Sequence, residues 1–392
     1  MDINFHYYAV KALAIKAEFP EHEAQAIASY SQFVDDFDET GSVLLEYVPE
    51  WARYLTVPGP GGSYWFTHVT TGFNSWFNMA MLTLEENQRW IVMPFHFIPR
   101  APLNTLPNRI DWRVIPARMD TDSLIRDMLI EARTTLLHGA VADRQTNLMR
   151  IGMLLHIFAD TYAHQRFSGF WGWENHSYLT NVTNNINGAD ETSSYWPNSY
   201  WSLPSIGHTN VGHAPDDSNV RFTMKQRLNE NDNYSASLTR SNTECYCDAA
   251  KEILNYLRSC RGLGEISLAA WDTITINLSH GFLTTSKDVP TLNNHWHTLF
   301  PETAFHYNDA PMRNKPQSVK ELTGESRMAA EAFGVKPIVF ATKSDMWYRY
   351  NVIADQIRVR ANGAPHHDPL HEAMKAAVAT KGSIPFAEDG EE

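Results

Sequence analysis

Apolar residues recur at helical spacing along several stretches of the chain, and this pattern predicts a mostly helical protein. Leu148, Ile151, Leu155 and Phe158 follow one another at intervals of three or four residues, which places them on one face of a helix over 143–166. Further helices are expected over the following ranges: 3–17, 20–34, 120–138, 245–260, 318–333 and 345–361.

Other stretches lack this period. Two pieces rich in aromatic and β-branched residues predict strands, namely SYWFTHVTT from residue 63 and RWIVMPFHFIP from residue 89. Residues 168–240 are dense in Asn, Ser, Gly and Trp, so we expect a long loop region that forms part of a site. Residues 366–392 predict a partly disordered C-terminal extension. The expected architecture is mainly α, one helical domain over 1–365 with β-hairpin and long loop insertions.

Composition and charge narrow the classes of function. With 43% hydrophobic and 20% charged residues, the chain has the usage of an ordinary globular protein. Its net charge of −13 argues against a long duplex nucleic acid as partner. Three cysteines do not make a disulfide scaffold. No secretory signal and no apolar run of transmembrane length is found, so the cytoplasm is the default compartment, and signal-independent export is compatible with the sequence.

The strongest chemical motif lies inside the predicted helix over 143–166. His156, Asp160 and His164 are spaced four residues apart, and because four residues turn a helix by about 400°, their side chains lie in one stripe. Histidine nitrogens and aspartate oxygens are both good zinc ligands. The apolar neighbours indicate a buried helix, and a buried aspartate needs an ion pair or a metal. The stripe therefore predicts metal ligation.

Weaker candidates surround this motif. His208 and His213 lie in GHTNVGHAPDD, whose two aspartates are Asp216 and Asp217. Each of the other candidates also has an ordinary explanation as a core or surface residue. They are His6 in NFHYY, Asp35 or Asp36 in FVDD, His68 in FTHV and His96 in PFHFIP.

The order of these residues resembles that of the zinc-dependent phospholipase C and single-strand nuclease superfamily, all-helical enzymes that cleave phosphate esters with three zinc ions. The resemblance implies a phospholipase C-like bundle with the following ligands: His6, Asp35 or Asp36 as the bridging carboxylate, His68, His156, Asp160, His164, and His213 with Asp216 or Asp217. The motifs FHYYAVKALA, VDD, PFHFIP and LHIFADTYAHQ are also similar to those of a family of uncharacterised bacterial proteins.

The chain departs from the superfamily pattern at the site itself. His164 follows Asp160 by four residues, where the superfamily ligand follows by six. The secreted enzymes bind one zinc through the amine of a processed N-terminal tryptophan, and we expect no such ligand here. His208 and His96 are additional candidates without a counterpart. One to three zinc ions fit this set of residues.

The residues and the resemblance together predict a zinc-dependent hydrolase. The expected reaction is hydrolysis of a phosphodiester in a phospholipid or nucleotide, with Asp35 bridging metals or orienting the attacking water. Trp171, Trp173, Trp196 and Trp201 are candidates for stacking on a base or receiving an acyl chain. A metal-dependent amidase or peptidase and a non-catalytic structural-metal protein are the alternatives. A delivered antibacterial effector is compatible with each hydrolase hypothesis.

Overall fold

The computed structural model describes residues 1–39, 42–59, 62–72, 83–195, 204–313, 319–321, 335–340 and 344–366, together with residues 372, 375–376 and 379. Chain contacts divide it into two compact units. The first comprises Met1–Val34, Ser75–Asn308 and Arg360–Gly363, and the second comprises Asp35–Asn74, Asp309–Val359 and Ala364–Glu392. The single domain expected over 1–365 stays a prediction. The expected C-terminal extension lies almost entirely outside the described residues.

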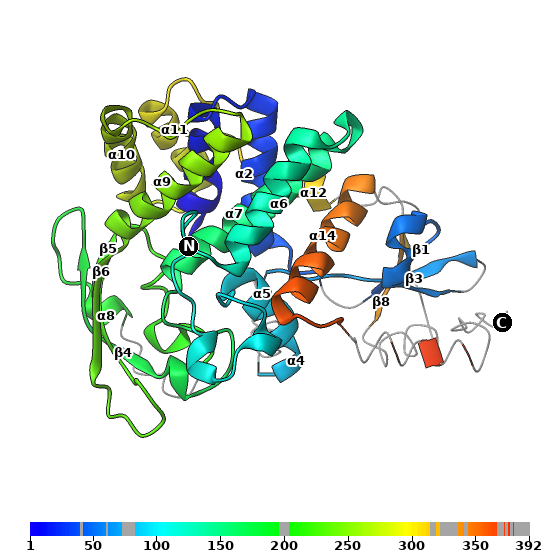
Figure 1. The fold of residues 1–392 in the computed structure, drawn as a ribbon, viewed down its shortest axis with the longest axis horizontal. Helices are drawn as coiled ribbons and strands as arrows, with labels where there is room; N and C mark the ends of the chain where they lie inside the picture. Colours follow the sequence, from blue (N-terminus) through cyan, green and yellow to red (C-terminus); the bar gives the residue numbers. More distant parts are fainter. Residues whose placement is uncertain are drawn as a thin grey trace. The chain divides into compact units, whose positions relative to one another are not determined.

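Helices dominate the first unit (Figure 1). They are η1 (Asn4–Ala9), α1 (Val10–Lys16), α2 (Glu21–Asp36, which reaches into the second unit), α6 (Leu124–His138), α7 (Arg144–Ala163), α9 (Asn242–Cys260), α10 (Leu268–Phe282) and α11 (Val289–Leu299). Side-chain caps explain where several of them begin: Ser123, Ser241 and Ser267 each accept a backbone N–H from the first turn. The helices predicted over 3–17, 20–34, 120–138, 143–166 and 245–260 are confirmed.

Helix α7 forms the centre of this unit. From residue 147 to residue 163 every residue except Arg150 is buried, so the helix is enclosed on all sides. It packs closely on α2, because a Cβ added at Gly152 would lie 2.3 Å from the carbonyl oxygen of Ile27. The chain's N-terminus lies beside α7 (Figure 1), where the Met1 amine contacts Asp160.

The region over 168–240 contains an antiparallel sheet, so the prediction of a long loop region is wrong there. Its strands are β4 (Ser177–Asn184), β5 (Val220–Gln226) and β6 (Ala236–Ser241), with β5 in the middle. Alternate residues of β5 are buried, which gives the sheet one face against the core. The sequence RWIVMPFHFIP is also helical rather than extended: it forms η4 (Gln88–Val92) and α5 (Met93–His96).

The second unit is built on a mixed sheet with the strand order β2-β3-β1-β8-β7. The strands are β1 (Ser42–Leu45), β2 (Thr56–Pro58), β3 (Tyr64–Thr67), β7 (Val319–Glu321) and β8 (Val335–Phe340). Strand β1 pairs antiparallel with β3 and parallel with β8. The unit also holds α14 (Asp345–Asn362), whose last residues belong to the first unit; this helix confirms the prediction over 345–361. Where 318–333 is described it is the strand β7, so a helix there is wrong.

These two sheets correct the predicted fold class. The chain has a mixed α/β fold, not a mainly α bundle with hairpin insertions. Short helical turns complete it: η2 (Glu50–Leu55), α4 (Glu85–Asn87), η5 (Leu103–Thr105), η6 (Arg109–Trp112), η7 (Val141–Asp143), η8 (Trp173–Asn175), α8 (Thr192–Tyr195), η10 (Thr209–Val211) and α12 (Ala310–Arg313). Among the described helices, none is both long and apolar enough to cross a membrane.

Candidate metal centre

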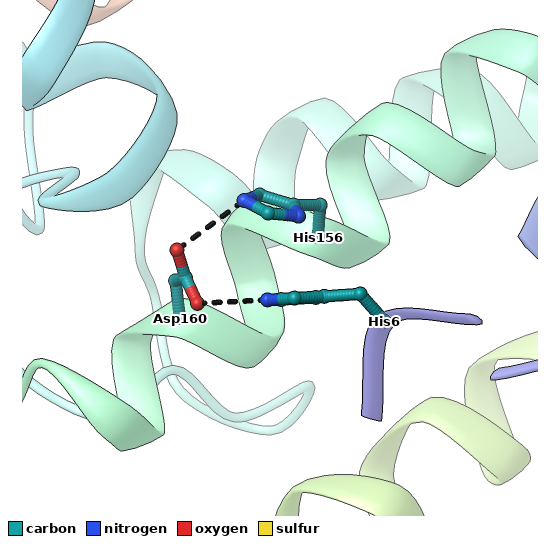
Figure 2. Close-up of side chains that lie close together, drawn as sticks. All are labelled: His6, His156 and Asp160. Carbon is teal, nitrogen blue, oxygen red and sulfur yellow. Dashed lines mark ion pairs between the residues drawn. The ribbon is translucent and has the colours of Figure 1, made fainter. Parts of the chain in front are cut away.

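The i, i+4 spacing in α7 produces the geometry that the sequence predicts. The His156 and Asp160 side chains meet on one side of the helix, with Nε2 3.3 Å from Oδ2. The π-helical segment η1 brings His6 to the same carboxylate, with its Nε2 3.2 Å from Oδ1 (Figure 2). All three side chains are at most 1% exposed. Residues 150 positions apart in the sequence thus share one buried carboxylate, each histidine facing a different oxygen.

His96, at the end of α5, completes a triangle with the α7 pair. Its Nδ1 lies 3.3 Å from Asp160 Oδ2 and 3.4 Å from His156 Nε2. Zinc bonds of 2.0–2.1 Å in tetrahedral geometry separate two ligand atoms by about 3.3–3.4 Å. The three atoms therefore have the spacing of one face of a zinc tetrahedron.

The second oxygen of Asp160 faces a different set of groups. Besides His6, the Met1 amine nitrogen lies 2.7 Å from Oδ1. The same nitrogen is 3.2 Å from Asp216 Oδ1, so it lies between the two carboxylates. Asp160 consequently connects two groups of nitrogen atoms through its two oxygens.

A second carboxylate, Asp216, gathers His164 and His208. His164 Nε2 is 3.0 Å from Oδ1, and His208 Nε2 is 3.2 Å from Oδ2. The other ring nitrogen of each histidine faces a backbone carbonyl: His164 Nδ1 lies 2.6 Å from His96 O, and His208 Nδ1 lies 2.8 Å from Gly212 O. These carbonyls can only accept, so each Nδ1 carries a proton, and in the neutral imidazole the Nε2 lone pair is then aimed at the carboxylate.

Lone pairs that face carboxylate oxygens call for a cation between them. Burial lowers the pKa of His6 to about 4, and neighbouring His156 adds to the effect. Burial likewise lowers the pKa of His208 to about 4, although Asp216 opposes it. Both imidazoles are therefore neutral near pH 7, the form that binds metals.

The carboxylates behave in the opposite sense. Burial alone would raise the pKa of Asp160, but the Met1 amine and the histidines His164, His156 and His6 outweigh it and hold the pKa well below its usual range. The pKa of Asp216 is also held well below its usual range, against the effect of burial, chiefly by His208 and the Met1 amine. The cluster thus combines ionised carboxylates with the neutral imidazoles of His6 and His208. A donor set rich in nitrogen with two carboxylates fits zinc better than magnesium or calcium.

One predicted ligand, His213, is not part of this cluster. His213 is exposed, and its carbonyl oxygen accepts hydrogen bonds from the backbone N–H groups of Asp216 and Asp217. Asp35, one residue before the end of α2, belongs to the second unit. His68 belongs there too, where its Nε2 pairs with Glu39 at 2.8 Å. Ligation by Asp35 and His68 stays a prediction.

Two participants have no counterpart in the ligand order that the resemblance implies. His96 has an apolar setting in PFHFIP that is typical of a core histidine, and only the fold brings it to Asp160. The Met1 amine carries no sequence signal. Of the four tryptophans expected to contact substrate, Trp171 is about half exposed and Trp173 lies in η8. Trp196 and Trp201 lie outside the described residues.

Comparison with known proteins gives a family but no activity. A family model described as "Family of unknown function (DUF6765)" matches residues 1–362. No curated protein and no solved structure matches the chain.

Proposed function

The chain belongs to DUF6765, a family of unknown function, and we propose from the geometry of its site that it is a zinc-dependent phosphodiesterase. The observation that carries the proposal is the divided use of Asp160. One oxygen faces His96 and His156, and the other faces His6. A carboxylate with nitrogen donors at both oxygens is suited to bridge two metal ions, and paired ions are typical of enzymes that cleave phosphate esters.

The exposure of the ligands supports a catalytic site over a closed structural one. His6, His156 and Asp160 are almost fully buried, whereas His208 and Asp216 are 18% and 20% exposed. Substrate therefore has access from the side of His208 and Asp216. The number of donors also exceeds the four that a single structural zinc takes.

The chain's own residues have separable roles in this proposal. Asp160 holds the two halves of the cluster together, and the carbonyls of His96 and Gly212 fix the tautomers of His164 and His208. When bound, zinc ions act as Lewis acids that polarise a phosphoryl oxygen and make water acidic enough to attack near neutral pH. The buried position of Asp160 excludes bulk water from the centre of the cluster and strengthens its electrostatic interactions.

The experiment is a substrate panel assayed with zinc-loaded protein. It contains a generic phosphodiester, short-chain phosphatidylcholine, single-stranded DNA and RNA. We expect turnover of at least one substrate, loss with chelator and recovery with zinc. Asp160→Asn keeps the shape of the side chain but removes its charge, so it should reduce metal content and lower turnover by more than about 100-fold.

His213→Ala is the matched control, because it removes an exposed histidine of the same loop that stands outside the cluster. It should retain metal and activity. Asp35→Asn tests the predicted role of that carboxylate and should lower turnover if it bridges metals or orients water. Zinc-loaded protein that cleaves no phosphate ester would contradict the proposal. Cleavage of amides or peptides would favour the amidase alternative. Inactivity on every substrate would favour the structural-metal alternative.

A further inference from the structure

A buried arginine joins the two segments that carry His164 and Asp216. Arg240, one residue before the end of β6, is 7% exposed. Its Nη1 donates to the carbonyl oxygens of Tyr162 at 2.7 Å and Ala163 at 2.9 Å, directly before His164. Its Nη2 donates to the carbonyl oxygen of Pro215 at 3.2 Å, directly before Asp216. One planar guanidinium thus bonds both the C-terminal end of α7 and the loop over 208–217, which carries His208 and Asp216.

The first residues of α9 extend this contact along the loop. Asn242 is fully buried, and its Nδ2 donates to the carbonyl oxygens of Ala214 at 2.6 Å and Asp217 at 2.8 Å. The Tyr246 hydroxyl lies 2.8 Å from Pro215 O and 2.9 Å from Asp216 O. Donors from β6 and α9 therefore cover the carbonyls of residues 214–217. The loop backbone is fixed while the Asp216 carboxylate remains directed at the two histidines.

The other half of the cluster is held by different elements. His156 and Asp160 lie within the buried length of α7, and His96 is held by α5. Their mutual distances follow from the α7 backbone and its packing on α5. On α7, Arg240 bonds the carbonyls of Tyr162 and Ala163, which follow Asp160 in the last turn of the helix, whereas His156 lies more than one turn earlier.

We propose that Arg240, assisted by Asn242 and Tyr246, is a positioning residue that aligns Asp216 with His164. Metal binding by His164, His208 and Asp216 then depends on Arg240. Metal binding by His96, His156 and Asp160 does not. The proposal rests on the metal cluster of the proposed function. Groups that orient ligands typically change metal affinity by about 10–100-fold when they are replaced.

The test is metal binding by Arg240→Lys, read by elemental analysis of zinc-loaded protein and by titration calorimetry. Lysine keeps the charge, but its single ammonium nitrogen cannot reproduce the planar arrangement of donors by which the guanidinium bonds three carbonyls. We expect the folded variant to lose about one zinc per chain, or to bind its weakest ion at least about 10-fold less tightly, while the tighter ion is retained. Tyr246→Phe removes a single hydroxyl and should weaken the same ion by a smaller factor, which keeps the proposal testable if Arg240→Lys does not fold.

Arg113→Lys is the matched control. Arg113 is another buried arginine of the first unit, and it donates to the carbonyl oxygens of Glu174 and Arg227, away from the ligands. Its replacement should leave zinc content unchanged. Wild-type protein that binds no zinc overturns the proposed function and this inference together. If the wild type binds two or more ions and both Arg240→Lys and Tyr246→Phe bind them equally well, only the inference fails. It also fails if folded Arg240→Lys loses all ions alike.

Discussion

Asp2 shows how burial near the cluster affects a single ionisable side chain. Its Oδ2 accepts hydrogen bonds from Asn4 at 3.2 Å and from Ser218 at 3.3 Å. Burial, reinforced by the charge of Asp217, raises the pKa of Asp2 from 3.8 to about 6. Between these two pH values the folded chain binds more protons than the unfolded chain, so this carboxyl group lowers stability as the pH rises through the window.

Asp2→Asn should therefore stabilise the metal-free protein at pH 7.5. Each unit of pKa shift corresponds to about 1.4 kcal/mol, and because Asp2 is only partly buried we expect a gain of about 1–2 kcal/mol. Near pH 4 the gain should disappear, since the wild-type carboxyl group is then protonated in the folded state. Urea unfolding at both pH values measures the difference. An equal gain at pH 4 and pH 7.5 would contradict the argument.

At the scale of a secondary-structure element, α7 combines two functions in one helix. It forms the buried centre of the first unit, and its surface carries His156 and Asp160. Gly152 precedes His156 by about one turn and lies against α2. A Cβ there would come within 2.3 Å of Ile27 O and 3.1 Å of Ser31 N. These are backbone atoms of a packed helix, so they cannot move aside cheaply.

Gly152→Ala should accordingly destabilise the protein by about 1–3 kcal/mol, although alanine favours an isolated helix. Because α7 must shift to accept the methyl group, zinc affinity should fall as well. Thermal unfolding and zinc titration measure the two effects. Gly264→Ala is the control, since nothing lies within 4 Å of a Cβ there and that variant should behave as wild type. Full stability and zinc affinity in Gly152→Ala would show that α2 and α7 are not packed so closely.

At the scale of the whole molecule, the cluster joins segments that are far apart in the sequence. Its residues come from η1, α5, α7 and the loop over 208–216, all within the first unit. An unfolded chain does not hold these groups together, so a metal that binds them stabilises only the folded state. Binding therefore contributes directly to the stability of this unit.

Removal of zinc by a chelator should lower the melting temperature. With free zinc at 100 times the dissociation constant, the ligand contributes about 2.7 kcal/mol, which corresponds to a shift on the order of 5–10 °C for a unit of this size. Differential scanning calorimetry with and without chelator measures it. Asp160→Asn should show little response to chelator. Verified zinc loss with an unchanged melting temperature would mean that the cluster does not link these segments.

Features whose geometry is local were predictable from the amino-acid sequence alone. An i, i+4 spacing on a strongly periodic helix places two side chains together whatever the rest of the fold does, so His156 and Asp160 were predictable as a pair. The boundaries of α7 were predictable for the same reason. The strands within 168–240 were not, because their pairing depends on partners up to tens of residues away.

The folded chain, by contrast, sets which oxygen of Asp160 faces which histidine, and it brings His96 but not His213 into the cluster. RWIVMPFHFIP is apolar except for Arg89 and His96, so its sequence shows no period that separates a helix from a strand, and it forms helical turns in the fold. The same fold carries His96 to Asp160. Distances between residues of distant segments are set by how helices and loops pack, and the spacing of residues along a chain contains no information about them.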